Sequence, residues 1–461
     1  MYQTDLTNYH KSYFLPLGRA DNFGVNCFYL NIADTGIILD CGIHPRIKGI
    51  NAIPDFSLLN DKPVDFVLIS HAHQDHIGSL PFLVRQFPHV RVLMTHATLA
   101  IARLMLKNAT AILQKRLDET LTPYSFDELD MLLKSVITFN YEEKFELKGR
   151  HNFEQRIYGR FYDAGHILGS AGILIESENE NVFYSGDIKL SEQTLLEGAK
   201  LPDKKINTLI LEATYGSTDT NLIGTRESEI KRFTDSINKV LAENGSILCP
   251  VFALGKTQEI LSLIYELMET KKIPETAIYT GGLGRGISHV YDRYKFTLWK
   301  RNKPYSLKTI PQENLYRIKR LEHFKRYPGI VLASSGMMVN DTVSFELSKF
   351  WFKFNNFAIF PVGYMDPETP GYLVLNAKKN SDISFSEEGP VYKVNCNIES
   401  FRFSAHSTRE ELIQIINKLN PDRVILMHGD EEAVDWMGYE ILSSNKNIKV
   451  NLAEGFKKII L

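Results

Sequence analysis

Residues 71–78 read HAHQDHIG, which places three imidazoles and one carboxylate within six consecutive positions. The chain of 461 residues contains 13 histidines, so this clustering is a local feature and not a consequence of composition. Imidazole nitrogens and carboxylate oxygens are ligands that zinc prefers, and histidines two apart on an extended loop can face the same way. The β-type run VDFVLIS at 64–70 precedes the stretch, so we predict a metal site on a loop at a strand end.

One loop can serve two adjacent ions, but the remaining ligands must come from elsewhere in the chain. Three candidates follow β-type runs and have glycine beside them, which lets backbone and side chains crowd around an ion: His166 in DAGHILGS, Asp187 in YSGD and His428 in LMHGD. We expect Asp187 to bridge two metals. Asp40, in the turn LDCG, is expected to orient His71 or His73 as a hydrogen-bond acceptor rather than to bind metal itself.

The composition sets limits on function. The formal net charge of −2 excludes a globally basic nucleic-acid binder but allows a locally basic cleft. The four cysteines have no C-x-x-C spacing and are predicted to be reduced thiols in the core. No apolar run is long enough to span a membrane, and the first residues lack the apolar segment of a secretion signal. We therefore expect a cytoplasmic enzyme without membrane contact.

The chain is longer than one hydrophobic core normally organises, which indicates a second domain. From about residue 209 the pattern becomes strand, helix, strand, which is typical of a parallel sheet. S-F-D-E at 125–128 predicts a helix that begins with a capping box. We expect an α/β protein in which residues 1–208 and 373–461 form one domain and residues 209–372 form a domain inserted into it.

Several motifs carry a family resemblance. The succession LDCG, HAHQDHIGSLP, DAGHILGSA and YSGD resembles the metallo-β-lactamase fold, an αββα sandwich with metals at one edge. ILEATYG, PVFALGKTQEIL, ASSGMM, FSAHS and LMHGD are similar in order and spacing to the β-CASP branch of that fold, whose members are nucleases. The resemblance covers nearly the whole chain. It implies a sandwich with an inserted β-CASP cap domain built on a parallel βαβ sheet.

The resemblance also implies a ligand set and a mechanism. Two Zn²⁺ ions per chain are expected, with Mn²⁺ as a substitute. Their expected ligands are His71, His73 and His166 for one ion, Asp75, His76 and His428 for the other, and Asp187 for both. His406 would contact the scissile phosphate or protonate the leaving oxygen, and Glu212 would fix its tautomer. The expected catalytic residues are therefore Asp40, Asp75, Glu212 and His406.

The function that follows from the resemblance is zinc-dependent hydrolysis of single-stranded RNA to 5′-phosphate and 3′-hydroxyl products, in RNA processing or decay. His428 favours RNA, because DNA-repair members of the branch usually carry Val at that position. Two alternatives remain: a DNA exonuclease of the repair or defence type, and a catalytically inactive scaffold subunit of an RNA-processing complex. Endonuclease or 5′-exonuclease action and a homodimer are also left open.

RNA binding is expected outside the metal site as well. Residues 291–328 contain eleven Lys or Arg against three acidic residues, with aromatic residues interleaved. This mixture suits a single strand whose phosphates meet cations and whose bases stack. The expected substrate-binding residues are Lys256, Arg293, Lys295, Ser335 and Gly336. The chain departs from the family pattern in GDIKL at 186–190, GGLG at 281–284 and VGYMDPETPG at 362–371.

Overall fold

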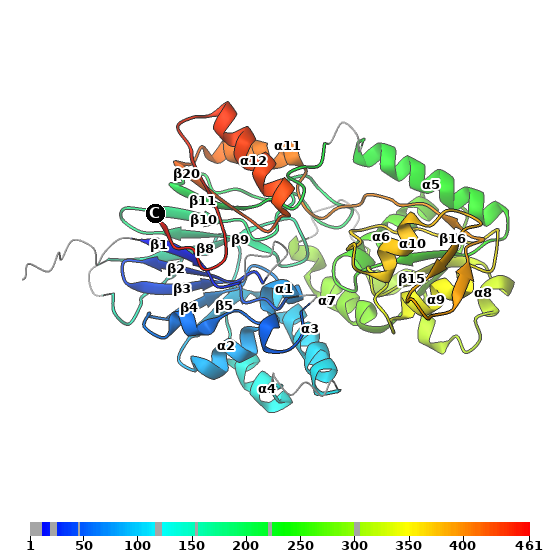
Figure 1. The fold of residues 1–461 in the computed structure, drawn as a ribbon, viewed down its shortest axis with the longest axis horizontal. Coiled ribbons are helices and arrows are strands. Elements are labelled where there is room, and N and C mark those ends of the chain that lie inside the picture. The colour runs from blue at the N-terminus through cyan, green and yellow to red at the C-terminus, as the bar shows by residue number, and fades with distance from the viewer. Residues whose placement is uncertain are drawn as a thin grey trace, which may run out of the picture. The chain divides into compact units, whose positions relative to one another are not determined.

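The computed structural model describes residues 12–18, 25–44, 47–115, 122–152, 155–219, 224–298 and 305–461. The chain forms two compact units (Figure 1). The first unit comprises Met1–Glu192, Glu197–Thr220 and His406–Leu461. The second comprises Gln193–Leu196 and Asn221–Ala405.

Two seven-stranded sheets build the first unit. One has the order β22-β1-β2-β3-β4-β5-β6, formed by Ile459–Ile460, Tyr13–Pro16, Phe28–Ile32, Thr35–Leu39, Phe66–Leu68, Arg91–Thr95 and Ile137–Phe139. The other has the order β21-β20-β11-β10-β9-β8-β7, formed by Lys449–Leu452, Arg423–Met427, Thr208–Glu212, Asn181–Tyr184, Ala171–Glu176, Tyr158–Asp163 and Phe145–Glu146.

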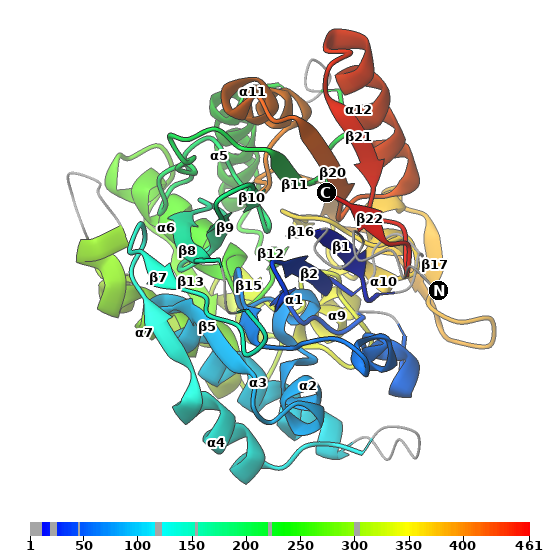
Figure 2. The same cartoon turned by 90° about the vertical axis from the view of Figure 1, so that its left-hand side faces the viewer.

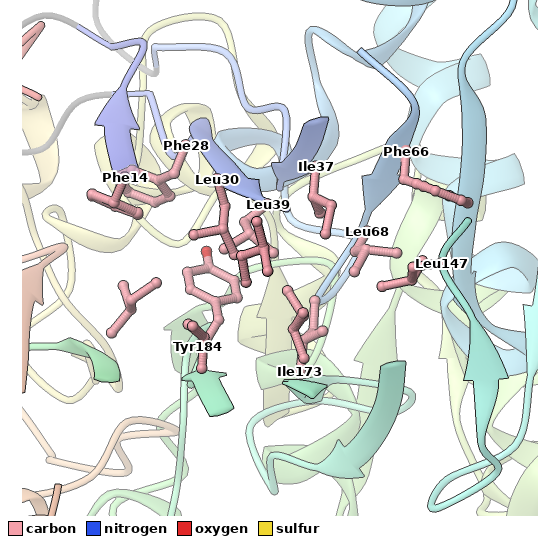
Figure 3. Close-up of a cluster of buried hydrophobic side chains, with 14 of the residues drawn as sticks. Phe14, Phe28, Leu30, Ile37, Leu39, Phe66, Leu68, Leu147, Ile173 and Tyr184 are labelled. Carbon is pink, nitrogen blue, oxygen red and sulfur yellow. The ribbon is translucent and has the colours of Figure 1, made fainter. Parts of the chain in front are cut away.

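The two sheets pack face to face. Side chains of the first sheet such as Leu30 and Leu39 meet Ile173 and Tyr184 of the second in one buried cluster (Figure 3). Every residue of β2, β3 and β11 is buried, so both faces of these strands are covered. The predicted αββα sandwich is therefore confirmed.

Helices lie outside each sheet. α11 (Arg409–Leu419) and α12 (Glu431–Ser444) bury their apolar faces against β11 and β20. Below β5 in Figure 2 lie α3 (His96–Lys115), which contacts that strand, and α2 (Leu80–Gln86) and α4 (Phe126–Ser135), which contact each other. None of the described helices is both long enough and apolar enough to cross a membrane.

The strand directions bring the polar motifs together. β3 pairs in parallel with β4, and β10 with β11 and β11 with β20 are parallel pairs. β8 and β10 both run antiparallel to β9, so β8 points the same way as β10. The carboxyl ends of these strands therefore share one edge of each sheet. The residues that follow or end them are Asp40 after β3, His71 after β4, His166 after β8, Asp187 after β10, Glu212 at the end of β11 and His428 after β20.

Glycines allow this edge to close. A Cβ added to Gly42, in the LDCG turn, would lie 1.7 Å from the carbonyl oxygen of Asp75. Gly186, directly before Asp187, has a φ of +54°, a conformation that L side chains rarely adopt. The backbone of the histidine loop can therefore lie against the turn that carries Asp40.

The second unit contains a six-stranded sheet in which all pairs are parallel, as the βαβ pattern predicted. Its order is β14-β13-β15-β12-β16-β19, formed by Glu313–Asn314, Ala277–Thr280, Gly329–Ala333, Ile247–Pro250, Ala358–Ile359 and Asn397–Ile398. Its longer helices are α5 (Arg226–Ala242), α6 (Lys256–Glu269), α7 (Gly282–Leu298), α9 (Val343–Trp351) and α10 (Pro370–Asn376). A separate hairpin joins β17 (Asp382–Ser384) and β18 (Val391–Lys393).

The second unit differs in extent from the predicted insertion at residues 209–372. β11, within which the predicted insertion begins, lies between β10 and β20 and so belongs to the first unit. β19 pairs with β16 and belongs to the second unit. The continuous part of the second unit, Asn221–Ala405, therefore begins and ends later in the chain than residues 209–372, and the short segment Gln193–Leu196 joins it. All four cysteines are buried thiols, as predicted.

The capping box predicted at 125–128 is present at the start of α4. The Ser125 side chain accepts a hydrogen bond from the backbone of Glu128, whose own side chain accepts one from the Ser125 backbone. We expect Ser125→Ala to lower the free energy of unfolding of the first unit by about 1 kcal/mol. Urea denaturation followed by circular dichroism measures this. Ser125→Thr keeps the hydroxyl and should restore most of the stability, and equal losses in both variants would contradict the capping explanation.

Candidate metal centre

Four ligand atoms meet at the edge of the sandwich. His73 Nδ1 lies 3.0 Å from His71 Nε2 and 3.1 Å from His166 Nε2. Asp187 Oδ2 lies 3.4 Å from His71 Nε2 and 3.6 Å from His166 Nε2. Ligands about 2.0–2.1 Å from a tetrahedral zinc lie about 3.3 Å from one another. The spacing of this first set, His71, His73, His166 and Asp187, therefore matches one zinc ion.

A second set surrounds the other oxygen of Asp187. His76 Nε2 lies 3.3 Å from Asp187 Oδ1 and 3.6 Å from Asp75 Oδ2. The ring of His428 places Nδ1 3.2 Å from Asp187 Oδ1 and Nε2 3.4 Å from Asp75 Oδ2. The structure thus brings together all seven predicted ligands. The second set is looser, because the two nitrogens of His428 face different carboxylates.

The chemistry of these atoms fits a cation. Asp187 Oδ1 is buried and has no hydrogen-bond partner among the described residues. Nε2 of His76 faces this oxygen. Nδ1 of the same ring contacts Asp40 at 2.7 Å. His76 Nε2 also lies 3.0 Å from Asn26 Nδ2, so the Asn26 amide shares this nitrogen with the carboxylates. A buried carboxylate oxygen without a donor, as Asp187 Oδ1 is, is costly unless a positive charge lies beside it.

The pKa shifts also indicate that the carboxylates of the site favour positive charge beside them. Burial alone would lower the pKa of His76, but Asp187, Asp75 and Asp40 outweigh it and raise this pKa well above its usual value. The pKa of His428 is raised to about 9, because Asp187 and Asp75 outweigh burial. Burial and the neighbouring His76 hold the pKa of His71 well below its usual value, which keeps that imidazole neutral, as a metal ligand must be.

Asp40 lies behind both ligand sets, but its contact differs from the prediction. It was expected to orient His71 or His73; instead its Oδ2 contacts His76 Nδ1 at 2.7 Å. It reaches His71 only through Ser70, whose Oγ lies 2.6 Å from Asp40 Oδ2 and 2.9 Å from His71 Nδ1. The reason is that the backbone N–H of Cys41 donates to the carbonyl oxygen of His76, which ties the turn to the end of the histidine motif.

Sequence reasoning missed Ser70 and Tyr184. The Tyr184 hydroxyl donates to Asp40 Oδ2 at 2.6 Å, and the backbone N–H of Ser70 donates to Asp40 Oδ1 at 2.6 Å. Both residues are fully buried. The signal was their place directly beside the motifs, Ser70 before the first histidine and Tyr184 in YSGD. Together they fix the carboxylate that orients one histidine in each set.

Glu212 and His406 form the predicted pair beside the first set. His406 Nδ1 lies 3.0 Å from Glu212 Oε2 and 3.1 Å from Oε1, and the rings of His406 and His166 lie 4.6 Å apart. Burial would lower the pKa of His406, but Glu212 outweighs it and raises this pKa. Thr214, not foreseen, donates to Glu212 and lies 3.2 Å from His428 Nδ1, so it links the pair to the second set.

The expected substrate-binding residues all belong to the second unit. The Lys256 ammonium is buried and donates to the carbonyl oxygen of Phe403, so its charge already has a partner there. Arg293 is exposed and Lys295 partly exposed on α7. Ser335 Oγ accepts from the backbone of Val339 at 3.0 Å. Gly336 is buried against Phe252, and residues 299–304 of the basic stretch lie outside the described residues. RNA binding by these residues stays a prediction.

Three family patterns match the chain. One described as "Metallo-beta-lactamase superfamily domain" matches residues 29–214, and one described as "Beta-Casp domain" matches residues 257–373. A third, "Zn-dependent metallo-hydrolase RNA specificity domain", matches residues 391–452. The three matches follow the order of the motifs along the chain.

Individual proteins are similar over almost all of the chain. Cleavage and polyadenylation specificity factor 73 of Drosophila melanogaster is 32% identical over 429 residues, which cover 90% of this chain and 59% of the relative. Integrator complex subunit 11 of Danio rerio is 28% identical over 435 residues, covering 92% of this chain and 70% of the relative. The chain thus spans little more than half the length of the first of these relatives.

A solved structure shares the fold. It is the crystal structure of a protein of unknown function from Enterococcus faecalis V583, with a TM-score of 0.55 and 15% sequence identity. The similarity covers 98% of this chain and 100% of that one. At this identity it supports the fold alone.

The Asp40 contacts generate a test of metal binding. Asp40→Asn replaces the carboxylate that orients His76, so we expect zinc affinity of the second set to fall by about 10- to 100-fold. Titration with a zinc-chelating dye under competition measures the two sites separately. Tyr184→Phe removes one donor and should cost less. Unchanged zinc affinity in Asp40→Asn would contradict the role given to this residue.

Proposed function

Because the chain belongs to the β-CASP branch of the metallo-β-lactamase superfamily, we propose that it is a zinc-dependent ribonuclease that hydrolyses single-stranded RNA. The observation that carries the proposal is the meeting of Asp187 with six other candidate ligand side chains, with the Glu212–His406 pair beside them. The match to the RNA specificity domain at residues 391–452 favours RNA as the polymer.

Two zinc ions fit the donor set. His71, His73 and His166 would hold one, Asp75, His76 and His428 the other, and Asp187 both. When bound, such ions lower the pKa of water to about 7 and neutralise charge on the phosphate under attack. The protein's part is to hold the ligands on strand ends, which are more rigid than free loops.

His406 supplies the proton in this proposal. Its Nδ1 faces the Glu212 carboxylate, so the ring directs Nε2 away from that carboxylate. The charge of Glu212 favours the protonated ring, which can then donate from Nε2 to the leaving O3′ of the RNA. Hydrolysis would leave a 5′-phosphate and a 3′-hydroxyl. The His406 side chain is 20% exposed, so it can regain its proton from water.

The relatives suggest a setting. Their names place them in cleavage and polyadenylation and in the Integrator complex. We extend this to RNA processing for the present chain, as a member of a larger assembly. A scaffold without activity is disfavoured, because such subunits usually lose ligands and this chain retains all seven.

A digestion experiment decides between RNA and DNA. Matched end-labelled RNA and DNA single strands, each with a 5′-phosphate or a 5′-hydroxyl, are incubated with the zinc-loaded protein. We expect cleavage of RNA to 5′-phosphate products, with little cleavage of DNA. Mononucleotides would indicate exonuclease action and internal fragments endonuclease action. Preferential DNA cleavage would replace the proposal with a DNA exonuclease, and a lack of cleavage with bound zinc would overturn it.

Substitutions separate metal binding from proton transfer. We expect Asp187→Ala and His73→Ala to abolish cleavage together with bound zinc, since both remove ligands. Glu212→Gln should lower kcat by about 10²- to 10⁴-fold while zinc content stays unchanged, because glutamine keeps an oxygen for the Ile188 N–H but has no charge to favour a protonated His406. Metal analysis and single-turnover assays give both readouts. His89→Ala, at an exposed position, is the control and should keep full activity. Zinc loss in Glu212→Gln would contradict the division of roles.

A further inference from the structure

Two loops of the first unit carry the central residues of the site, and a group of side chains joins them. Residues 187–191 contain Asp187, and residues 406–408 contain His406 and lead into α11, whose first turn includes Glu411. The joining group consists of Lys189, Ser407 and Glu411, which we call the loop staple. None of its members is a candidate metal ligand. Lys189 lies in GDIKL, where the chain departs from the family pattern, and Ser407 lies in FSAHS.

Ser407 joins the loops through both backbone and side chain. Its N–H donates to the carbonyl oxygen of Ile188 at 2.7 Å, and its Oγ accepts from the N–H of Leu190 at 2.9 Å. Ser407 is fully buried. The residue next to His406 is therefore fixed to residues directly after Asp187.

Glu411 adds a charged contact. Its Oε2 accepts from Lys189 Nζ at 2.9 Å, and its Oε1 accepts from the N–H of Ser191 at 3.1 Å. The side chains of Lys189 and Glu411 are 9% and 14% exposed. Buried charge pairs with these hydrogen bonds resist separation, because each charge would otherwise be left without water.

The same carboxylate also organises the helix. Glu411 forms a capping box with Thr408, accepting from the Thr408 N–H at 2.8 Å. Helix α11 therefore starts two residues after Ser407, and its first turn faces the loop of Lys189. Glu411 therefore both caps α11 and contacts the loop that follows Asp187.

Glu212 contacts both His406 and the residue after Asp187, so it couples the position of His406 to the loop that carries Asp187. Its Oε1 accepts from the Ile188 N–H at 2.6 Å, and the same carboxylate holds His406 Nδ1. A shift between the loops would move His406 relative to Asp187 even if every ligand stayed in place. Displacements of about 1 Å at a reacting group can cost about 10²-fold in rate.

We propose that Lys189, Ser407 and Glu411 are positioning residues that hold His406 in register with Asp187. This rests on the proposed function, since it assigns the register a role in RNA cleavage. The staple binds neither substrate nor metal and acts through His406 alone. A purely structural role would instead affect folding or zinc content without depending on His406.

A double-mutant cycle distinguishes these roles. Ser407→Ala and Glu411→Gln are made alone and in a His406→Ala background; glutamine can still complete the capping box. We expect each to lower kcat by about 10- to 100-fold with KM and zinc content nearly unchanged. In the His406→Ala background the further loss should be less than about twofold. Equal losses in both backgrounds, or loss of zinc, would overturn the proposal. Ser407→Thr, which keeps the hydroxyl, should recover part of the rate.

Glu176→Gln is the matched control. Glu176 pairs with Arg160 and Lys204, is 13% exposed, and ends β9 at the end of that strand away from His166. The Glu176→Gln substitution removes a carboxylate charge that is about as buried as that of Glu411 but contacts neither loop. We expect kcat to stay within about twofold of the unsubstituted protein. A loss equal to that of Glu411→Gln would show that the rate follows general stability instead.

Hydrogen exchange tests the staple without any cleavage. In the zinc-loaded protein, Glu411→Gln should speed exchange of the amides of residues 188–191 and 407–411, and leave residues 158–176 unchanged. Unchanged exchange at residues 188–191 would overturn the proposal whatever the activity. A protein that binds zinc but cleaves no RNA would end the proposed function, while the exchange result would still decide whether the staple holds the loops.

Discussion

The buried carboxylate of Asp187 is the constraint on which the rest of the site depends. One oxygen faces the first ligand set and the other faces the second, and Oδ1 has no hydrogen-bond donor among the described residues. A carboxylate without water is costly to bury unless positive charge comes with it. The surrounding side chains supply mainly imidazole nitrogens, which are neutral when they bind metal. The arrangement around Asp187 therefore favours the binding of cations.

The sandwich makes that arrangement possible. Ligands arrive from strands of both sheets, and the strands are held by a core in which residues such as Leu39, Tyr184 and Ile210 are fully buried. Close packing resists small displacements, so the strand ends keep their positions. Asp40 and His428 adopt positive φ values of 57° and 49°, which persist only where neighbours fix the backbone.

The sequence was most informative where chemistry is local. The approach of the seven candidate ligands to one another, the Glu212–His406 pair and the parallel sheet could be predicted, the first two from motifs that resemble a known family and the sheet from a repeated pattern. The partner of Asp40 could not, because it depends on a backbone contact between Cys41 and His76, which lie far apart in the chain. The sheet that the buried strand TLILE joins could not be predicted either, because such a strand reads the same in either sheet. The burial of Lys256 could not be predicted, because it depends on a contact with Phe403, which lies far away in the chain.

Two buried carboxylates, those of Asp40 and Glu212, each orient one histidine ring. Asp40 holds Nδ1 of His76, and Glu212 holds Nδ1 of His406, so each ring directs Nε2 away from its carboxylate. The environments then separate the roles. The His76 side chain has no exposure and faces Asp187, where its lone pair suits a metal, whereas the His406 side chain is 20% exposed and can exchange a proton with water. In the proposed function, exposure rather than the orienting contact would distinguish the metal ligand His76 from the acid His406.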